Sequence, residues 1–273
     1  MIVAPIPLLL YHSISNDPPP WAVPWTVSPD RFRGHMDELV ESGATPLTIS
    51  ALVDLLRAEK PLPRGAVAVT FDDGFADFGT TAAPIMAERG IAHTLYVTTG
   101  ALLPRTGRGE LRLQPAPMLG WSQLAELEAM GTELGGHSHT HPELDTLPPT
   151  RARDEVVRPK DLLEDLLGHP VHSFAYPHGY SSPRVRRLVA DAGYQSACGV
   201  RDAFSFRQDN PFSLARIVVQ PDATRQDIRF WLHGMGARII GSEEWHRTQL
   251  WRWFRRGRSL CARPMMFGSP FTQ

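Results

Sequence analysis

The chain has 273 residues, of which 42% are hydrophobic, which is enough for one large domain or two small ones. Its formal net charge is −1, so overall charge does not indicate nucleic acid as a partner. The two cysteines, Cys198 and Cys261, have a spacing typical of neither a metal site nor a disulfide framework.

The N-terminal residues predict a buried strand. Ile6–Tyr11 is a short apolar run. The first residues include Pro5 and Pro7, lack a basic start and are followed by no small-residue cleavage site, so a signal peptide is not expected. No apolar run reaches the roughly 18 residues that a membrane helix needs. We therefore predict a cytoplasmic location, with membrane association left open.

The next part of the chain alternates between helix and strand signals. Asn16–Ser28 is rich in Pro and Trp and predicts a surface loop. Ser28 is a typical N-cap, Pro29 suits the first helical position, and Gly43 ends the helix that they begin. The pattern then predicts a strand near 45–48, a helix over 50–59, a strand over 66–71, a helix over 76–89 and a strand over 91–97.

The same alternation continues after a loop over residues 100–120. Helices are predicted over 121–130, 150–167, 181–192 and 224–235, and strands over 133–135, 171–175, 194–198 and 215–219. Alternating strands and helices predict parallel β/α units. Several segments rich in ionisable residues directly follow predicted strands, and this end of the strands forms the rim where β/α barrels build their active sites.

Two adjacent carboxylates, Asp72 and Asp73, end the strand over 66–71 and precede Gly74. Neighbouring carboxylates repel each other unless a cation lies beside them. One aspartate could therefore bind a metal while the other stays free as a base. The alternative is an Asx turn that caps the following helix.

Three histidines, His137, His139 and His141, lie between Gly135-Gly136 and Pro142. Glycine and proline argue against a helix here, so a loop is expected. Imidazole nitrogens suit zinc and its first-row neighbours, and one Asp with two His would leave coordination positions open for water and substrate. The spacing does not decide which histidines bind, and a His-rich polar loop is the alternative.

Three further features lie at predicted strand ends or within a strand. His12 ends the first strand and is either structural or catalytic. The turn over 175–179 contains Pro177 and Gly179 and either presents backbone N–H groups to an oxygen or is an ordinary turn. Arg216 is a charge within an apolar strand; if buried it needs a carboxylate, for which Asp72 is a candidate, and otherwise it lies exposed at the rim.

The order of these motifs resembles the polysaccharide deacetylases, also called the NodB-homology or carbohydrate esterase family 4 domain. Thr70-Phe71-Asp72-Asp73-Gly74 matches the first family motif, and His137-Ser138-x-x-His141 matches the second. The resemblance implies that Asp72 is the catalytic base, that Asp73, His137 and His141 are the metal ligands, and that His139 is a bystander. It also implies a distorted (β/α) barrel of about seven parallel strands over residues 1–240, followed by a helical tail over 241–273.

Two motifs depart from the common family pattern. Where many members have Arg-x-Pro-Tyr, this chain has Ala175-Tyr176-Pro177-His178, so Arg216 would have to replace the arginine and the His178 backbone N–H would serve the oxyanion. The late Leu-x-His motif is found instead as Leu10-Tyr11-His12. This resembles the permuted branch of exopolysaccharide poly-N-acetylglucosamine deacetylases and assigns the general acid to His12.

The resemblance implies hydrolysis of N-acetyl groups on an amino-sugar glycan with a divalent metal, zinc first and cobalt, nickel or ferrous iron as alternatives. The competing interpretations are a metal-dependent hydrolase of a small non-peptide C–N bond and a glycan-binding relative without activity. The candidate substrate contacts are Trp25, Tyr176, Pro177 and Arg105.

The segment 243–256 is basic and aromatic and predicts a helix. Such a helix could lie on an anionic membrane surface, which would suit a lipid-linked glycan. The alternative is a helix packed across the barrel with its arginines in solvent.

Overall fold

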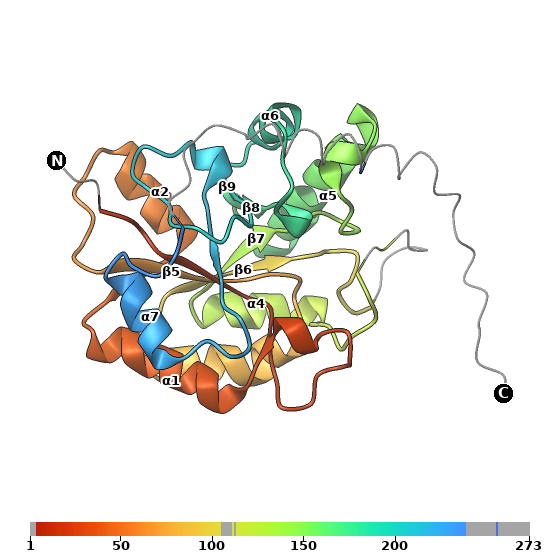
Figure 1. The fold of residues 1–273 in the computed structure, drawn as a ribbon. Coiled ribbons are helices and arrows are strands. Elements are labelled where there is room, and N and C mark those ends of the chain that lie inside the picture. Colours follow the sequence, from red (N-terminus) through yellow and green to blue (C-terminus); the bar gives the residue numbers. More distant parts are fainter. Residues whose placement is uncertain (1–3, 105–110, 112, 239–254, 256–273) are drawn as a thin grey trace, which may run out of the picture.

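The strands assemble into one curled parallel sheet with the order β10-β1-β5-β6-β7-β8-β9 in the computed structural model, which describes residues 4–104, 111, 113–238 and 255 (Figure 1). The strands of this path are β1 (Leu8–Tyr11), β5 (Ala66–Phe71), β6 (His93–Val97), β7 (Thr132–Gly136), β8 (Ser173–Ala175), β9 (Ser196–Cys198) and β10 (Ile217–Val218). β4 (Thr45–Leu47) pairs with the first half of β5.

The two ends of the strand order are connected through Leu214. Its N–H donates to the Ala197 carbonyl oxygen at 3.0 Å, and the Gly199 N–H donates to the Leu214 carbonyl oxygen at 2.8 Å. These bonds join β9 to the segment that leads into β10. The prediction of a distorted β/α barrel of about seven parallel strands is therefore confirmed.

The helices lie close to their predicted positions. They are α1 (Pro29–Glu41), α2 (Ile49–Arg57), α3 (Ala83–Ala87), α4 (Trp121–Ala129), α5 (Pro149–Leu167), α6 (Pro183–Asp191) and α7 (Arg225–Leu232). Ser28 caps α1 as predicted, since its hydroxyl accepts from the Arg31 N–H. The helix predicted over 76–89 contains a π-helical turn, Phe78–Ala82, before α3.

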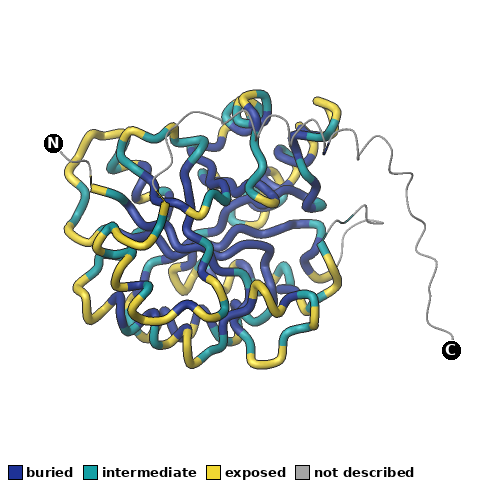
Figure 2. The backbone as a smooth tube through the Cα atoms, in the orientation of Figure 1, coloured by how far each residue is buried: buried dark blue, intermediate teal, exposed yellow. Residues whose placement is uncertain are grey.

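The sheet is buried on both faces, which explains why its strands are nearly continuous apolar runs (Figure 2). Alternate strand residues such as Leu9 and Phe71 pack outward, into the core shared with α1, α3, α4, α5, α6 and α7. The residues between them, such as Leu8 and Ala68, face the inside of the curl, where α2 covers them with Ile49, Leu52 and Val53.

The loop predicted over residues 16–28 has more structure than its sequence indicated. Its last residues form β3 (Thr26–Val27), which pairs with β2 (Ser13–Ile14) in a separate two-stranded sheet. This pairing holds the loop beside the end of β1. Within the described residues, no helix is long and apolar enough to cross a membrane.

Candidate active site

The period of two along each strand brings the candidate residues to one place. His12, Asp72 and Arg216 continue the set of strand residues that face the inside of the curl, and His137 does so after β7. Because the strands are parallel, His12, Asp72 and His137 meet at the carboxyl ends of β1, β5 and β7. Arg216 directly precedes β10, and its long side chain reaches Asp72 from there.

Asp72 and Arg216 form a bidentate ion pair, which is one of the two alternatives that the sequence left open for Arg216. The Arg216 Nη1–H donates to Asp72 Oδ1 at 2.6 Å and Nη2–H to Oδ2 at 2.7 Å, while Nε–H donates to the Gly199 carbonyl oxygen at 3.1 Å. Arg216 is 0% exposed. Burial by itself would raise the pKa of Asp72, but Arg216 and His137 outweigh it and hold the pKa below its usual value. The Asp72 carboxylate is thus ionised and fixed in orientation.

The Tyr96 ring packs against the Arg216 guanidinium. The Arg216 guanidinium carbon lies 5.5 Å from the centroid of the Tyr96 ring. The ring occupies space next to Gly135, where a Cβ atom would come within 2.5 Å of Tyr96 Cδ1. Glycine at position 135 is therefore a packing requirement of the site, a role that the sequence pattern alone did not reveal.

Asp73, His137 and His141 form a compact cluster of buried ligand atoms. Asp73 Oδ1 lies 3.4 Å from His137 Nε2 and 3.3 Å from His141 Nε2, and one ligand atom from each residue lies within 4.8 Å of the other two. The Asp73 Oδ1 atom is buried and has no hydrogen-bond partner among the described residues. The His137 Nδ1 atom is 2.8 Å from the Ala175 carbonyl oxygen, so Nδ1 carries the proton and Nε2 keeps its lone pair.

This donor set fits a divalent cation. Burial lowers the pKa of His141 to about 3, so its imidazole is neutral. Burial would raise the pKa of Asp73, but His137 and His141 hold it well below its usual range. Burial lowers the pKa of His137, but the Asp72 and Asp73 carboxylates outweigh it and raise that pKa above its usual value, so this place favours a positive charge. A carboxylate oxygen lies 3.3–3.4 Å from two imidazole nitrogens, and a bound divalent cation would supply that charge. The chemistry of these atoms suits zinc and its neighbours.

Backbone strain is concentrated in the same motifs. Among the described residues other than glycine, six have a positive φ, and four of these belong to the candidate site: Asp73, Ser138, His141 and His178. Side chains with a Cβ atom rarely adopt such angles, and their clustering is typical of functional sites. At Asp73 the φ angle of +76° means that the side chain no longer follows the inward and outward alternation of the β5 side chains.

The loop 137–141 is held by Glu155 of α5, which the sequence analysis did not identify. The Glu155 carboxylate accepts from the backbone N–H groups of His139 and Thr140 at 3.0 and 2.7 Å, and from the Thr140 hydroxyl at 2.6 Å. His139 turns away from the other two histidines and its Nδ1 lies 2.8 Å from the Thr99 hydroxyl. This orientation agrees with the bystander position that the resemblance implied for His139.

His12 lies where β1 ends, beside β5 in the sheet. Burial lowers its pKa, and the nearby Asp73 and Asp72 carboxylates oppose that effect. The ring centroid of the exposed Trp25 lies 5.4 Å from that of His12. An exposed aromatic side chain therefore lies next to His12.

The turn after β8 presents His178. The His178 and His141 ring centroids lie 4.6 Å apart, and no described residue accepts a hydrogen bond from the His178 backbone N–H. Gly179 follows with a φ of +72°, and a Cβ there would come within 2.4 Å of the Val200 nitrogen. Only glycine permits this turn, which sets the direction of the preceding N–H.

Two predicted substrate contacts, Tyr176 and Pro177, are buried, and a third, Arg105, is not described. Tyr176 is 0% exposed, packs outward like Phe174, and donates its hydroxyl to the Phe212 carbonyl oxygen at 3.0 Å. Its side chain belongs to the core, so the prediction of a substrate contact through the ring is corrected. Pro177 is also buried, at the start of the turn. Arg105 lies outside the described residues.

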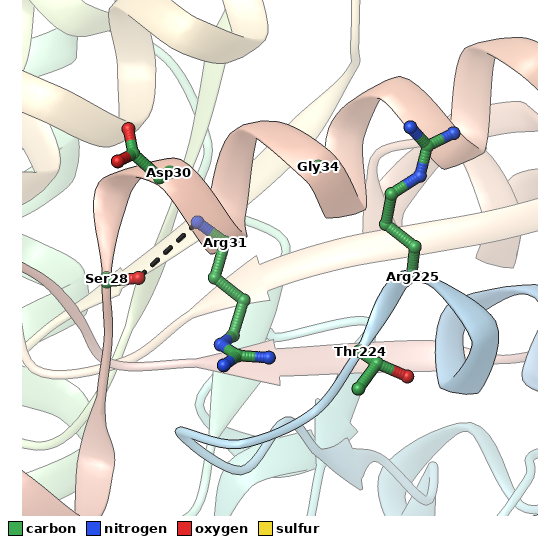
Figure 3. A pocket seen from close by; sticks show the side chains of 6 residues that line it. All are labelled: Ser28, Asp30, Arg31, Gly34, Thr224 and Arg225. Atoms are coloured by element: carbon green, nitrogen blue, oxygen red, sulfur yellow. Dashed lines mark hydrogen bonds between the residues drawn. The ribbon is translucent and has the colours of Figure 1, made fainter.

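A separate surface cavity of about 360 Å³ lies between the N-terminal ends of α1 and α7 (Figure 3). Its lining residues are Ser28, Asp30, Arg31, Gly34, Thr224 and Arg225. Both arginines already have partners, because Arg31 donates to the Ala223 carbonyl oxygen and Arg225 pairs with Glu38 and Glu41. The cavity shares no residue with the candidate active site, and we assign it no ligand.

Residues 59–197 match the sequence model of the polysaccharide deacetylase family. The chain is a member of this family. YxkH of Bacillus subtilis (strain 168), whose name places it among the polysaccharide deacetylases, is 24% identical over 218 residues, covering 80% of this chain and 72% of the relative. Family membership makes the protein a hydrolase that acts on amide C–N bonds, with glycans as its class of substrate.

Two solved structures share the fold over most of the chain. The Streptococcus pyogenes deacetylase PplD, solved in complex with acetate, is 24% identical with a TM-score of 0.74 and covers 83% of this chain and 97% of its own. IcaB from Ammonifex degensii is 23% identical with a TM-score of 0.71, covering 84% and 97%. At these identities the likeness is one of fold.

Proposed function

We propose that the protein is a metal-dependent deacetylase that removes N-acetyl groups from an amino-sugar glycan. The observation that carries this proposal is the buried cluster of Asp73, His137 and His141 immediately beside the Asp72–Arg216 ion pair. The interpretation as a glycan-binding relative without activity rested on Ala175 in place of an arginine. The guanidinium of Arg216, which directly precedes β10, pairs with Asp72, and this supports catalysis over binding alone.

Asp73, His137 and His141 would hold one divalent metal, with Zn²⁺ the first candidate and Co²⁺, Ni²⁺ or Fe²⁺ also compatible with the donors. When bound, such an ion polarises the acetamide oxygen and lowers the pKa of a bound water towards about 7. The Ala175 carbonyl oxygen, by accepting from His137 Nδ1–H, keeps the opposite nitrogen available as a ligand.

Asp72 would act as the general base. Its carboxylate is ionised and held by Arg216, and Asp72 Oδ2 lies 3.8 Å from His137 Nε2, so it borders the ligand cluster without belonging to it. It would take the proton from the attacking water, a step typically worth about 10²–10⁴-fold. Arg216 orients Asp72 in the way that a charged partner orients a base in other hydrolases.

His12 would protonate the departing nitrogen, since an amine leaves far more readily than an amide anion. The backbone N–H of His178 would donate to the negative oxygen that develops during attack. Trp25 would stack against the apolar face of a sugar ring, which its exposure and its position beside His12 support.

We further place the catalytic domain at residues 1–240 and the protein in the cytoplasm, as the sequence predicts. Apart from Arg255, the tail over 241–273 lies outside the described residues. Peripheral membrane contact through 243–256 therefore stays a prediction, to be tested by flotation with anionic liposomes.

The direct test is acetate release from purified protein before and after removal of metal and reloading with Zn²⁺. The substrates would be chitin oligomers, peptidoglycan fragments and lipid- or nucleotide-linked N-acetyl sugars. We expect Zn²⁺-dependent release from at least one of these glycans. Release only from small cyclic or linear amides would favour the alternative C–N hydrolase, and release that is unaffected by metal removal would refute the proposed metal dependence.

A further inference from the structure

Arg255 is the only residue after Arg238 that the structure describes, and it is buried against the rim of the sheet with 2% exposure. Its Nη1–H donates to Asp145 Oδ1 at 2.9 Å and its Nη2–H to Asp145 Oδ2 at 2.7 Å. Asp145 is itself 0% exposed. A second carboxylate, Glu143, lies 3.6 Å from Arg255 Nη1.

The planar face of the guanidinium packs on Tyr180, which follows the turn after β8. The Arg255 guanidinium carbon is 3.6 Å from the centroid of the Tyr180 ring, a close cation–π contact. One side chain from the C-terminal segment thus contacts two rim loops that come from different strands.

Both loops carry candidate active-site residues. Asp145 lies four residues after His141, a proposed metal ligand, and Tyr180 lies two residues after His178, the proposed oxyanion donor. The His141 and His178 rings are in edge contact, with centroids 4.6 Å apart. Arg255 therefore contacts both of the loops that carry these histidines. The proposed reaction requires the two loops to keep their relative positions.

The chemistry of these contacts requires arginine. A guanidinium forms two parallel hydrogen bonds to a carboxylate and stacks on an aromatic ring at the same time, whereas a lysine ammonium cannot do both. Without Arg255, the fully buried Asp145 carboxylate would lose its bidentate partner, which favours movement of the loop towards water.

We propose that Arg255 is a positioning residue of the active site, which fixes the loop of His141 against the turn of His178 although it lies outside the proposed domain of residues 1–240. This inference rests on the proposed function. Arg255 belongs to the segment 243–256, and its burial departs from the expectation that the arginines of a packed tail lie in solvent. The inference depends only on the contacts of Arg255.

The test compares Arg255→Ala and Arg255→Lys in the full-length chain. Arg229→Ala is the matched control, because Arg229 also forms a two-point pair with a carboxylate, that of Glu38 between α1 and α7, away from the rim. Three quantities are measured: amide hydrogen exchange of residues 141–145 and 178–180 in metal-free protein, Zn²⁺ affinity by calorimetry, and kcat and KM for the best glycan substrate.

For Arg255→Ala we expect faster exchange confined to the two loops, and a Zn²⁺ affinity and a kcat each lower by roughly 10-fold with a smaller change in KM. Arg255→Lys should recover part of each loss, and Arg229→Ala should change none of the three. Unchanged exchange and unchanged kcat in Arg255→Ala would overturn the inference, as would an equal effect of Arg229→Ala.

The two proposals fail in different ways. If the unmodified protein binds no Zn²⁺ and releases no acetate, the proposed function is wrong, while the exchange measurement still reports whether Arg255 holds the loops together. If the unmodified protein is active and Zn²⁺-dependent but indifferent to Arg255, only the positioning role is wrong.

Discussion

The neighbouring residues Asp72 and Asp73 belong to two halves of the site that differ in how their charge is balanced. On the Asp72 side, both carboxylate oxygens accept hydrogen bonds from Arg216, and the charge is neutralised within the fold. On the Asp73 side, a carboxylate oxygen faces two imidazole nitrogens and has no hydrogen-bond donor among the described residues. This difference supports the proposed division of roles, with Asp72 as the base and Asp73 as a metal ligand.

The largest effect on rate is expected from Asp72→Asn, which removes the base but leaves the ligand cluster in place. We predict a fall in kcat of about 10²–10⁴-fold with Zn²⁺ still bound. The measurement is acetate release together with metal content by mass spectrometry. Full activity in this variant would show that Asp72 is not the base.

His12→Ala tests the proposed acid by changing the leaving group. For an N-acetyl glycan we predict a fall in kcat of about 10²-fold or more, because the departing amine needs a proton. For an aryl acetate, whose phenolate leaves unprotonated, the fall should be much smaller. Equal losses on both substrates would argue that His12 shapes the site without transferring a proton.

Arg216→Met tests the ion pair between Asp72 and Arg216. Breaking a buried ion pair typically costs about 3–5 kcal/mol of stability, which thermal or urea unfolding would measure. Arg216→Lys, which keeps a positive charge but loses the fork, should lie between the native protein and Arg216→Met.

The pH dependence of Arg216→Met follows from the pKa of Asp72. In the native protein this pKa lies below its ordinary value of 3.8, so the ion pair contributes stability above about pH 3.8 that is lost as pH falls through the folded-state pKa. Without Arg216, only His137 and His12 oppose the effect of burial, so the pKa of Asp72 should lie higher than in the native protein and the stability gained above about pH 3.8 should be smaller. The acid limb of kcat/KM should move to higher pH. An unmoved acid limb would contradict this account of Asp72.

The smallest effect is expected from Trp25→Ala. Loss of a stacking surface for a sugar should raise KM by about 2- to 10-fold and leave kcat and Zn²⁺ binding nearly unchanged. Val23→Ala is the matched control, since Val23 is exposed in the same loop and is assigned no contact. If KM for chitin oligomers stays the same, or changes equally in both variants, Trp25 does not contact substrate.

Much of the fold was readable from local signals. Ser28-Pro29 marked the start of α1, the apolar run 66–71 coincided with β5, and the strand ends carried the chemical motifs. The pairing of Arg216 with Asp72 was one of two alternatives, because a buried guanidinium needs a carboxylate nearby, and the burial of Arg216 decides against exposure at the rim. Their catalytic roles stay predictions.

Other features depend on contacts between segments far apart in the chain. Nothing in the local sequence indicated that Glu155 would hold the histidine loop or that Arg255 would reach the rim. The incorrect prediction for Tyr176 was avoidable. Side chains alternate along a strand, so Tyr176 lies on the same outward face as Phe174. Strand parity would have placed its ring in the core.

The most direct test is a parallel Zn²⁺ titration of metal-free native protein, Asp72→Asn and Asp73→Asn, with folding checked by circular dichroism. Asp72→Asn should bind one equivalent of Zn²⁺ with near-native affinity. Asp73→Asn should lose most of its affinity, because Asp73 and not Asp72 belongs to the ligand cluster with His137 and His141. Native-like affinity in folded Asp73→Asn, or equal losses in both variants, would contradict the division of roles between the two aspartates.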